Sequence, residues 1–405
     1  MPGYDNAGQH LSLRSLSRPT QMMPMLEMSA HRDRSEILEF RSDWERLASE
    51  QSFSFPNFDE LVGLIDALPE DVMLLARRVD GKLVTLACVY RAWGRKAYRA
   101  GERRLFSLPV HEVLLFGSSM LGRVDPGTVA AMLDAVGAEF RFHVLTLGET
   151  SVDSPLYTSV DQLRSRFLIA ELSRKRSLRW LIRLPADFES YMMSLGSKSR
   201  QNIRREMRQL DKQFACDFQT VTSEAQVEPF LAASESISRK TYQWNVGQRM
   251  LDDEPTRRSL KDRARRAELR CYSLSLNGQP CAFMRGKLVG GVFEFETAGF
   301  DPDFGKASPG AVLLMWAVRD LIENSTCTVF DFGQGGDNVG YKARFGSESH
   351  QCAALQLGSR RNPYALLLFG LQGALFAFLN MANKVVGNGA FRARVKRALR
   401  KYGDH

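Results

Sequence analysis

The chain has 405 residues, more than one ordinary domain needs, and this length predicts two domains with tails. An apolar share of 44% and a charged share of 25% are typical of a globular protein. The chain therefore has enough apolar residues to bury a sizeable hydrophobic core, which excludes a chain that is disordered throughout. The net charge of +9 favours anionic partners: phosphorylated cofactors, nucleotide-activated substrates, nucleic acid or a lipid surface.

The six cysteines are scattered without a Cys-x-x-Cys pair, and most lie in apolar, strand-like runs. This pattern predicts buried free thiols in a reducing compartment and indicates neither a zinc site nor a disulfide framework. Residues 1–30 lack the continuous apolar core of a signal peptide, because Pro24 and Glu27 interrupt their methionine-rich run. We therefore expect a cytoplasmic protein with a flexible N-terminus over residues 1–30.

The first half, residues 31–175, alternates helical and strand patterns. Its expected elements are a helix from Ser35, strands 72–79 and 83–90 around the turn Asp80-Gly81, a strand through Tyr98, a helix begun by Asp125-Pro126-Gly127, and a strand over 143–147.

The second half, residues 176–358, repeats this order. Its expected elements are a strand over 178–184, a helix through Tyr191, a helix over 199–214, strands 269–276 and 280–286 around Asn277-Gly278, a strand over 292–298, a helix over 311–322 begun by Ser308-Pro309-Gly310, and a strand over 328–332. Pro126-Gly127 aligns with Pro309-Gly310, and Val144–Gly148 with Val329–Gly333, which suggests a duplicated α/β module.

The start of the helix at Ser308-Pro309-Gly310 is the most informative feature. Serine can cap the helix, proline needs no hydrogen bond there, and glycine lets an anion approach the backbone, while Lys306 adds positive charge. An ordinary capped helix is the alternative. The first copy has Asp125 at the capping place, and its carboxylate would repel a pyrophosphate, so we expect the cofactor at the second copy.

Arg200, Arg204 and Arg208 are four residues apart on the helix predicted over 199–214 and share one face. Three guanidinium groups in a stripe suit a phosphate-bearing substrate, because their planar forks match phosphate oxygens. A solvated helix face is the alternative. No aromatic residues interleave the stripe, as a stacking platform for nucleic acid requires.

A glycine-rich loop after the strand over 328–332 carries candidate catalytic groups. Asp331 could act as a base toward an amine, or it could only fix the loop through backbone N–H groups. Tyr341 could donate a proton to a thiolate leaving group. Glu296, on the strand over 292–298, could polarise a bound amine, although a solvent-facing edge explains it equally well. No Walker A motif, HExxH or GxSxG elbow supports a competing chemistry.

Three segments in this order resemble the CelD/BcsL-type acetyltransferase domain of the GNAT superfamily: Ser308-Pro-Gly-Ala-Val-Leu-Leu, Phe330-Asp-Phe-Gly and Tyr341-Lys-Ala-Arg-Phe-Gly. The Ser199-Arg-Gln-Asn-Ile-Arg-Arg helix and the Gly299-Phe-Asp-Pro-Asp-Phe loop also fit, so the resemblance covers about residues 176–350. This bacterial family is associated with cellulose and other exopolysaccharide synthesis. It is related to the FemAB/FemX enzymes, which carry two GNAT-like modules.

The resemblance implies an α/β (α+β) fold of tandem GNAT-like modules, each a mixed, mostly antiparallel sheet flanked by helices. It implies acyl-CoA as the donor, with its pyrophosphate at Ser308, Pro309, Gly310 and Ala311, and no metal. Transfer would go to an amine or hydroxyl of a sugar, nucleotide-activated or lipid precursor in exopolysaccharide or cell-envelope synthesis. Asp331, Tyr341 and Lys342 are carried over by motif position, Lys342 as a substrate-binding residue. The usual GNAT Gln/Arg-x-x-Gly-x-Gly/Ala run is absent here.

The tail, residues 359–405, is first apolar and then basic. Residues 364–382 are uncharged and near the minimum length of a membrane span, and 391–401 form a candidate basic amphipathic helix. Peripheral attachment to an anionic cytoplasmic leaflet and a helical hairpin packed on the catalytic domain are both open.

Two other functions remain open from the sequence. One is a FemX-like transferase that uses aminoacyl-tRNA, favoured by the Arg200 face, and it is the one case in which we expect nucleic acid as a partner. The other is a non-catalytic polysaccharide-assembly protein with a degenerate GNAT fold.

Overall fold

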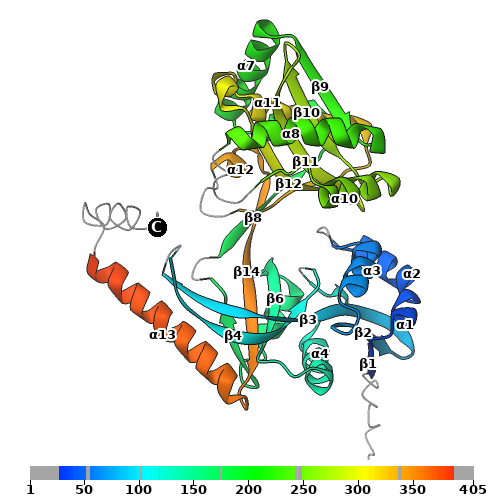
Figure 1. Cartoon of the computed structure of the whole chain (residues 1–405), viewed down its shortest axis with the longest axis vertical. Helices are drawn as coiled ribbons and strands as arrows, with labels where there is room; N and C mark the ends of the chain where they lie inside the picture. The colour runs from blue at the N-terminus through cyan, green and yellow to red at the C-terminus, as the bar shows by residue number, and fades with distance from the viewer. Residues whose placement is uncertain are drawn as a thin grey trace, which may run out of the picture.

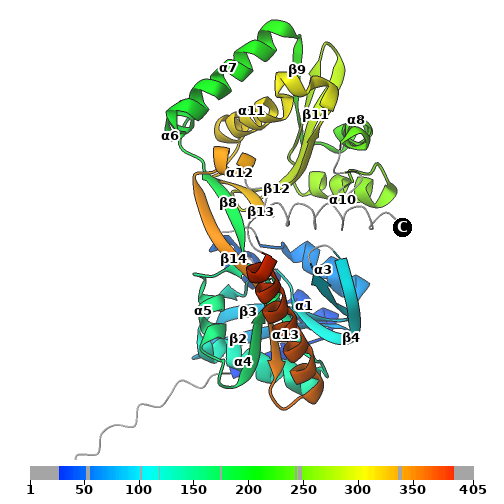
Figure 2. The same cartoon turned by 90° about the vertical axis from the view of Figure 1, so that its left-hand side faces the viewer.

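The computed structural model describes residues 27–51, 55–100, 103–117, 119–173, 176–241, 244, 249–335 and 340–386. Two modules share one sheet of 14 strands, in the order β1-β2-β3-β4-β6-β14-β8-β13-β12-β11-β10-β9, with β5 beside β3 and β7 beside β14 (Figures 1 and 2). The strands β1 to β7 belong to the first module and β8 to β13 to the second.

The first module begins with helices that cover one face of its strands. Its elements are β1 (Glu27–His31), α1 (Arg34–Leu38), α2 (Arg41–Ser49), α3 (Phe58–Ala67), β2 (Val72–Val79), β3 (Lys82–Ala100), β4 (Arg103–Leu115), β5 (Leu121–Gly122), α4 (Pro126–Glu139), β6 (Val144–Ser151), α5 (Pro155–Asp161) and β7 (Phe167–Glu171).

The second module follows the same plan and ends with a return to the first. Its elements are β8 (Ser177–Arg183), α6 (Phe188–Ser194), α7 (Ser197–Gln213), β9 (Cys216–Val221), η1 (Glu224–Gln226), α8 (Val227–Lys240), α10 (Glu254–Arg265), β10 (Cys271–Leu276), β11 (Gln279–Val289), β12 (Val292–Phe300), η2 (Pro302–Ala307), α11 (Pro309–Asn324), β13 (Val329–Gly335) and α12 (Gly340–Phe345); β14 (Glu348–Ser359) and α13 (Pro363–Val386) complete the chain.

The predicted duplication is confirmed by the strand pairing. In each module an antiparallel hairpin is followed by a helix that begins at a proline, α4 at Pro126 and α11 at Pro309. The next strand then pairs in parallel with the second hairpin strand, β6 with β4 from Val144 and β13 with β12 from Val329. The fold is thus the predicted mixed α/β arrangement of two GNAT-like modules.

The strand β14 belongs to both modules. Its residues 348–352 pair with β8, and from Cys352 onward it pairs with β6 on one side and, from Leu355, with β7. The predicted boundary between residues 175 and 176 falls between β7 and β8. At the other end, the chain returns to the first module within β14, before the predicted boundary at 358.

Several elements of the first module were not predicted: β1, α3, β4, β5, α5 and β7. The helix α3 begins with a capping box in which the Asn57 side chain accepts from Glu60 N–H and the Glu60 carboxylate accepts from Asn57 N–H. The strand predicted through Tyr98 is not separate from the strand predicted over 83–90, because both belong to β3, which forms a long hairpin with β4. The pattern of β4 is obscured by Pro109 and by charged residues, and only the pairing with β3 makes it a strand.

Separate hydrophobic clusters hold the modules. One large cluster packs α6, α7 and α11 against the second module's strands, around side chains such as Tyr191, Tyr272 and Phe330. Two others lie on opposite faces of the first module's strands, one around Val129 and Leu145 and one around Trp44 and Phe58. All six cysteines are unpaired, and five of them are buried.

The apolar part of the tail is the helix α13, which packs on the first module rather than on the second. Leu368 is fully buried beside Tyr98, whose hydroxyl donates to the Leu368 carbonyl oxygen at 3.0 Å. Among the described residues, one helix is long and apolar enough to cross a membrane by length and composition, Pro363–Met381, and 17% of that stretch is buried. The basic segment 391–401 lies outside the described residues.

Candidate active site

The helix α11 starts directly after the 3-10 turn η2. Ser308 is its N-cap residue, with φ 54° and ψ 43°. The Ser308 side chain makes no capping hydrogen bond, so the prediction that this serine caps the helix is wrong. Both Ala311 N–H and Val312 N–H donate to the Ser308 carbonyl oxygen, at 3.1 and 3.2 Å. In the described part of the chain no acceptor contacts the N–H of Gly310, which leaves that amide for a ligand.

The surroundings of Gly310 suit close approach by an anion. A Cβ atom at Gly310 would lie 3.2 Å from the Phe300 ring. A side chain at this position would therefore crowd the space in front of the helix start, which glycine leaves open. Lys306 is exposed in the last turn of η2, and Pro309 is buried at the first position of α11. The 16-residue helix adds the positive end of its dipole to these groups.

The equivalent helix start in the first module already holds an anion. The Asp125 carboxylate accepts from Thr128 N–H at 2.8 Å and lies 2.9 Å from the Arg77 guanidinium. Burial opposes ionisation, but the hydrogen bonds from Arg77 and Thr128 outweigh it and lower the pKa of Asp125 to about 2. The helix start of the first copy is therefore occupied by a carboxylate of the chain itself, and the cofactor site at the second copy stays a prediction.

The strands β12 and β13 run side by side only at their beginnings. They pair in parallel from Val292 with Val329 to Glu294 with Asp331. Beyond that point β12 continues along β11 and β13 along β8. Because parallel strands end at the same edge of a sheet, the carboxyl end of β13 and the loop leading to α11 share one edge, where ligands of α/β folds gather.

Asp331 is almost fully buried, with 1% of its surface exposed, in an ion pair with Arg179 of β8. Arg179 Nε donates to both carboxylate oxygens, at 3.1 and 2.9 Å, and Gly333 N–H donates to Oδ1 at 2.8 Å. Burial acts to lower the pKa of Arg179, but its hydrogen bonds to Asp331 raise it above the usual range. This geometry favours the loop-fixing role of Asp331 over the role of a base.

Tyr341 and Lys342 begin the short helix α12 beside β13. The Tyr341 ring meets the Phe332 ring edge-on at 5.9 Å, and 45% of the tyrosine is exposed. Desolvation of the phenol raises the pKa of Tyr341, so the hydroxyl keeps its proton at neutral pH and can donate it. Lys342 is buried, its Nζ donates to the Phe332 carbonyl oxygen at 2.8 Å, and burial lowers its pKa.

The carboxylates of β12 are held by basic residues that the sequence reasoning did not connect with them. Glu296 lies between two guanidinium groups, 2.8 Å from Arg263 and 2.8 Å from Arg285, so its carboxylate is engaged in two ion pairs within the protein. Glu294 pairs with Lys287 at 3.1 Å, and burial raises the pKa of Glu294. The Gly290-Gly291 turn between β11 and β12 places Lys287 opposite Glu294, so this pair could have been predicted from the position of the turn.

The three arginines of α7 mostly contact the protein itself. Arg200 donates to the carbonyl oxygens of Met193 and Leu195, at 3.1 and 3.3 Å, near the end of α6. Arg204 pairs with Glu189 of α6, and Arg208 donates to the Arg204 carbonyl oxygen at 3.2 Å. The predicted stripe therefore lies along one face of α7, but two of its members serve to attach α6.

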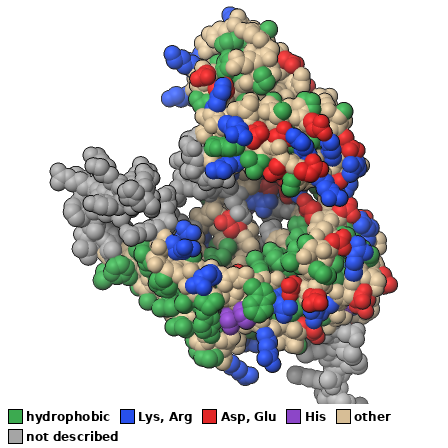
Figure 3. Space-filling view, viewed as in Figure 1, with side chains coloured by type: hydrophobic (Ala, Val, Ile, Leu, Met, Phe, Trp, Pro, Cys, Tyr) green, Lys and Arg blue, Asp and Glu red, His purple; other side chains and the backbone are tan. Residues whose placement is uncertain are grey.

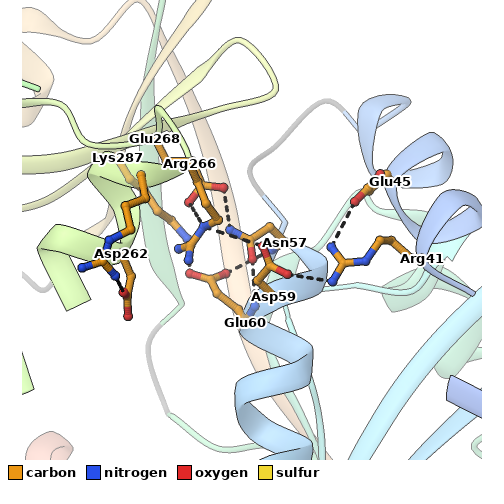
Figure 4. A network of polar contacts seen from close by, with 10 residues as sticks. Arg41, Glu45, Asn57, Asp59, Glu60, Asp262, Arg266, Glu268 and Lys287 are labelled. Carbon is orange, nitrogen blue, oxygen red and sulfur yellow. Dashed lines mark hydrogen bonds and ion pairs between the residues drawn. The ribbon is translucent and has the colours of Figure 1, made fainter. Parts of the chain in front are cut away.

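A polar network joins the two modules between α3 and the second module (Figure 4). Glu60 lies 2.8 Å from Lys287, the Asn57 amide donates to Glu268 at 2.8 Å, and Arg266 pairs with Glu268 at 3.0 Å. Through Lys287 this network reaches Glu294, the neighbour of Asp331 in the sheet. The first module therefore contacts β11, two strands away from β13 in the sheet. No group of three or more metal-ligating side chains occurs among the described residues.

Comparison with known proteins finds a family match within the second module. The acetyltransferase (GNAT) domain family matches residues 197–343, which include α7, the start of α11, Asp331, Tyr341 and Lys342. No functionally curated protein is similar to the chain in sequence.

Several solved structures are similar to this chain at low sequence identity. FemX superposes with a TM-score of 0.56 at 10% identity, over 81% of this chain and 98% of FemX. A tandem GNAT protein from the clavulanic acid biosynthesis pathway has a TM-score of 0.46 at 12% identity, over 82% and 98%. L-PGS from Bacillus licheniformis has a TM-score of 0.45 at 14% identity, over 80% and 99%. The similarity to FemX establishes the fold alone.

Proposed function

We propose that the protein is an acyl-CoA-dependent acyltransferase whose donor binds at the start of α11. The observation that carries this proposal is the Gly310 amide, without an acceptor in the described chain, at a helix N-terminus inside the segment that matches the GNAT acetyltransferase domain. Ser308, Pro309 and Ala311 form the rest of that helix start, and the exposed Lys306 supplies a cation for the pyrophosphate.

The chemistry that suits this site is direct acyl transfer. The nitrogen or oxygen of the acceptor bonds to the thioester carbonyl carbon, the carbon–sulfur bond breaks, and the CoA thiolate takes a proton. Tyr341 is the proton donor in this scheme, because its phenol is partly exposed and stays protonated at neutral pH. Asp331 and Arg179 hold the β13 end in place, and the acceptor loses its own proton to solvent or to a group on the substrate.

The basic net charge supports an acceptor that carries negative charge. We infer a sugar, nucleotide-activated or lipid precursor of bacterial exopolysaccharide or cell envelope, supported by the net charge of +9 and by the resemblance in the sequence motifs. The aminoacyl-tRNA alternative depended on an open Arg200 face. Because Arg200 and Arg204 bind α6, the feature that favoured tRNA is weakened.

The outer face of α13 suggests where the protein works. Large apolar side chains stand exposed along it, Leu366, Leu367, Phe378 and Met381, and hydrophobic atoms gather over this helix in Figure 3. Trp93, Leu105 and Phe106 of the β3–β4 hairpin are also exposed. Such a surface, with Arg360 and Arg361 just before α13, suits peripheral binding to the anionic inner face of the cytoplasmic membrane.

Calorimetric titration with acetyl-CoA and longer acyl-CoAs tests the donor site. Gly310→Glu places a carboxylate at the helix start, and we expect at least about tenfold weaker binding, worth about 1.4 kcal/mol. Gly310→Ala is the matched control, because it adds the same Cβ near Phe300 without charge. Equal binding by both variants, or no binding by the wild type, would contradict the proposal. Binding without turnover on amine, sugar and lipid acceptors would favour a non-catalytic role.

A further inference from the structure

A cavity of about 1790 Å³ lies in the first module, on the side of α13. Its walls are the far part of the β3–β4 hairpin, β7, the beginning of β8, and α13. Pockets for drug-sized ligands usually have volumes of about 300–1,000 Å³, so this cavity has room for a larger molecule. None of the residues discussed for the donor site lines it.

The polar wall of this cavity is built around Lys96. Its Nζ hydrogen-bonds the side-chain oxygen of Gln356, which is 3% exposed on β14. The Gln356 amide in turn donates to Glu112 at 3.3 Å and contacts the Thr146 hydroxyl at 3.1 Å. These contacts hold the lysine in a fixed position, with its ammonium group beside the cavity rather than in bulk water.

Positive charge dominates the lining. Six basic side chains line the cavity against three carboxylates, Glu112, Glu149 and Glu171. The basic residues are Arg95, Lys96, Arg99, Arg164, Arg176 and Arg360. Three of the six make their hydrogen bonds to uncharged acceptors: Arg95 to Ser107, Lys96 to Gln356, and Arg360 to the Arg164 carbonyl oxygen. A cavity with this balance attracts an anion.

The opposite wall is mostly apolar, with Gln372 and Asn380 as its polar members. It is formed by α13, which contributes Phe369, Leu375, Phe376 and Leu379, and which has no acidic residue in its 24 positions. Gly373 of the same helix also faces the cavity, and a Cβ atom there would meet nothing within 4 Å. One wall thus suits a charged head group and the other a hydrocarbon chain.

The cavity extends to β8, the strand that pairs with β13 next to the candidate catalytic loop. Ser177 and Leu178 at the beginning of β8 line it, and Leu178 pairs with Gly335 at the end of β13. The next residue of β8 is Arg179, which holds Asp331. A ligand that fills the cavity therefore comes close to the carboxyl end of β13, where the acyl group is delivered in the proposed reaction.

We propose that this cavity binds an amphiphile with an anionic head group, with the chain against α13 and the head group near Lys96. The identification of this amphiphile as the acyl acceptor rests on the proposed function. The binding of the amphiphile in the cavity is independent of that function. The helix α13 then separates the cavity from the apolar outer surface, so a lipid can enter from a membrane that contacts the same helix.

Titration calorimetry on the full-length protein tests the binding. The probe is dihexanoyl phosphatidylglycerol below its micelle concentration, compared with dihexanoyl phosphatidylcholine and with glycerol 3-phosphate. We expect the anionic lipid to bind at least about tenfold more tightly than either comparison ligand. Equal binding of phosphatidylcholine would overturn the anionic head group, equal binding of glycerol 3-phosphate would overturn the chain site, and no binding of the lipid would overturn the proposal.

Two substitutions on one helix locate the site. Gly373→Leu adds a side chain inside the cavity, and we expect it to weaken the lipid by about tenfold or more. Gly370→Leu is the matched control, because Gly370 lies on the same helix with open space at its Cβ and does not line the cavity. Equal effects of the two variants would place the lipid elsewhere.

Acyl-CoA titration of the same proteins separates this proposal from the proposed function. Gly373→Leu should bind acyl-CoA as the wild type does, because the start of α11 belongs to the other module. If the wild type binds the lipid but no acyl-CoA, the proposed amphiphile site stands and the proposed acyltransferase function is wrong.

Discussion

At the scale of single residues, the buried pair of Asp331 and Arg179 decides how the candidate loop is held. Both side chains come from strands of the second module, and the carboxylate also accepts from Gly333 N–H. Gly333 has a φ of 63°, a backbone conformation that glycine adopts without strain. The aspartate thus fixes the turn at Gly333, directly after Phe332, whose carbonyl oxygen accepts from Lys342.

Replacing Asp331 separates a structural role from a catalytic one. Asp331→Asn leaves Arg179 buried without its anion, and we expect a loss of about 3–5 kcal/mol in the free energy of unfolding. The double variant Asp331→Leu with Arg179→Met should recover much of that loss, because no charge remains buried. Denaturant unfolding measures both. Unchanged stability with a large fall in kcat would instead make Asp331 the base.

Lys96 gives the cavity a pH dependence. Burial lowers the pKa of Lys96 to about 8, although the charge of Glu112 acts to raise it. The other charged groups that line the cavity are Glu112, Glu149, Glu171 and five arginines. The ammonium that attracts an anion is therefore present below about pH 8 and is lost above it.

We accordingly expect affinity for dihexanoyl phosphatidylglycerol to be highest below pH 8 and to fall about tenfold by pH 9.5. The lipid phosphate does not titrate in this range, so the change belongs to the protein. In Lys96→Met the affinity should be low and flat across the same range. A wild-type profile that matches that of Lys96→Met would exclude Lys96 as the head-group contact.

At the scale of elements, α4 and α11 both begin at a proline, but their N-termini have different surroundings. The helices α4 and α11 follow equivalent strands, but Asp125 puts a carboxylate at one helix start and Ser308 leaves the other open. The N-terminus of a helix favours negative charge, so one copy satisfies it internally and the other can take a ligand.

The contact between α3 and β11 links the modules mechanically. Lys287 lies between Glu60 and Glu294, and these carboxylates outweigh burial and raise its pKa. Because the folded pKa lies above the unfolded value, this stabilisation is complete below about pH 10.5 and is lost as the pH rises through the folded value.

A double-mutant cycle measures this link. For Glu60→Gln and Lys287→Met we expect a coupling energy of about 1–3 kcal/mol in the free energy of unfolding at pH 7. The coupling should decline as the pH rises above the pKa of Lys287. Arg34 with Asp66, an exposed pair within the first module, is the control cycle and should give about 0–1 kcal/mol. Additive effects of Glu60→Gln and Lys287→Met would show that the contact does not join the modules.

At the scale of the whole molecule, β14 and α13 bring the end of the described chain back to the first module (Figures 1 and 2). The helix α13 covers the cavity with one face and exposes an apolar face on the other, with Leu367 at 48% and Phe378 at 60% exposure. This arrangement places the proposed lipid site, the outer apolar surface and the β14 strand in one continuous part of the molecule.

Vesicle flotation tests the outer surface. We expect the protein to float with phosphatidylcholine vesicles that contain 30% phosphatidylglycerol, about tenfold more than with pure phosphatidylcholine. Leu367→Asp with Phe378→Asp should abolish the binding. Met193→Asp is the matched control, since Met193 is equally exposed on α6 of the other module. If the control and the double variant behave alike, α13 does not contact the membrane.

Much of the fold follows from local patterns. The turns at Asp80-Gly81 and Asn277-Gly278 have the positive φ angles that such hairpins require, and both hairpins formed as predicted. Proline at the first position marked α4 and α11 correctly. The duplication was visible because two similar modules repeat the same local signals in the same order.

By itself the sequence determined the two-module plan, the helix start at Gly310 and the motifs that match the GNAT domain. Only the tertiary structure decided that Arg179 pairs with Asp331, 152 positions away, and that Lys287 reaches Glu60, 227 positions away. It likewise decided that α13 closes a cavity of the first module. The physical reason is that periodicity and turn chemistry act over a few residues, whereas such partners are set by how whole strands and helices pack.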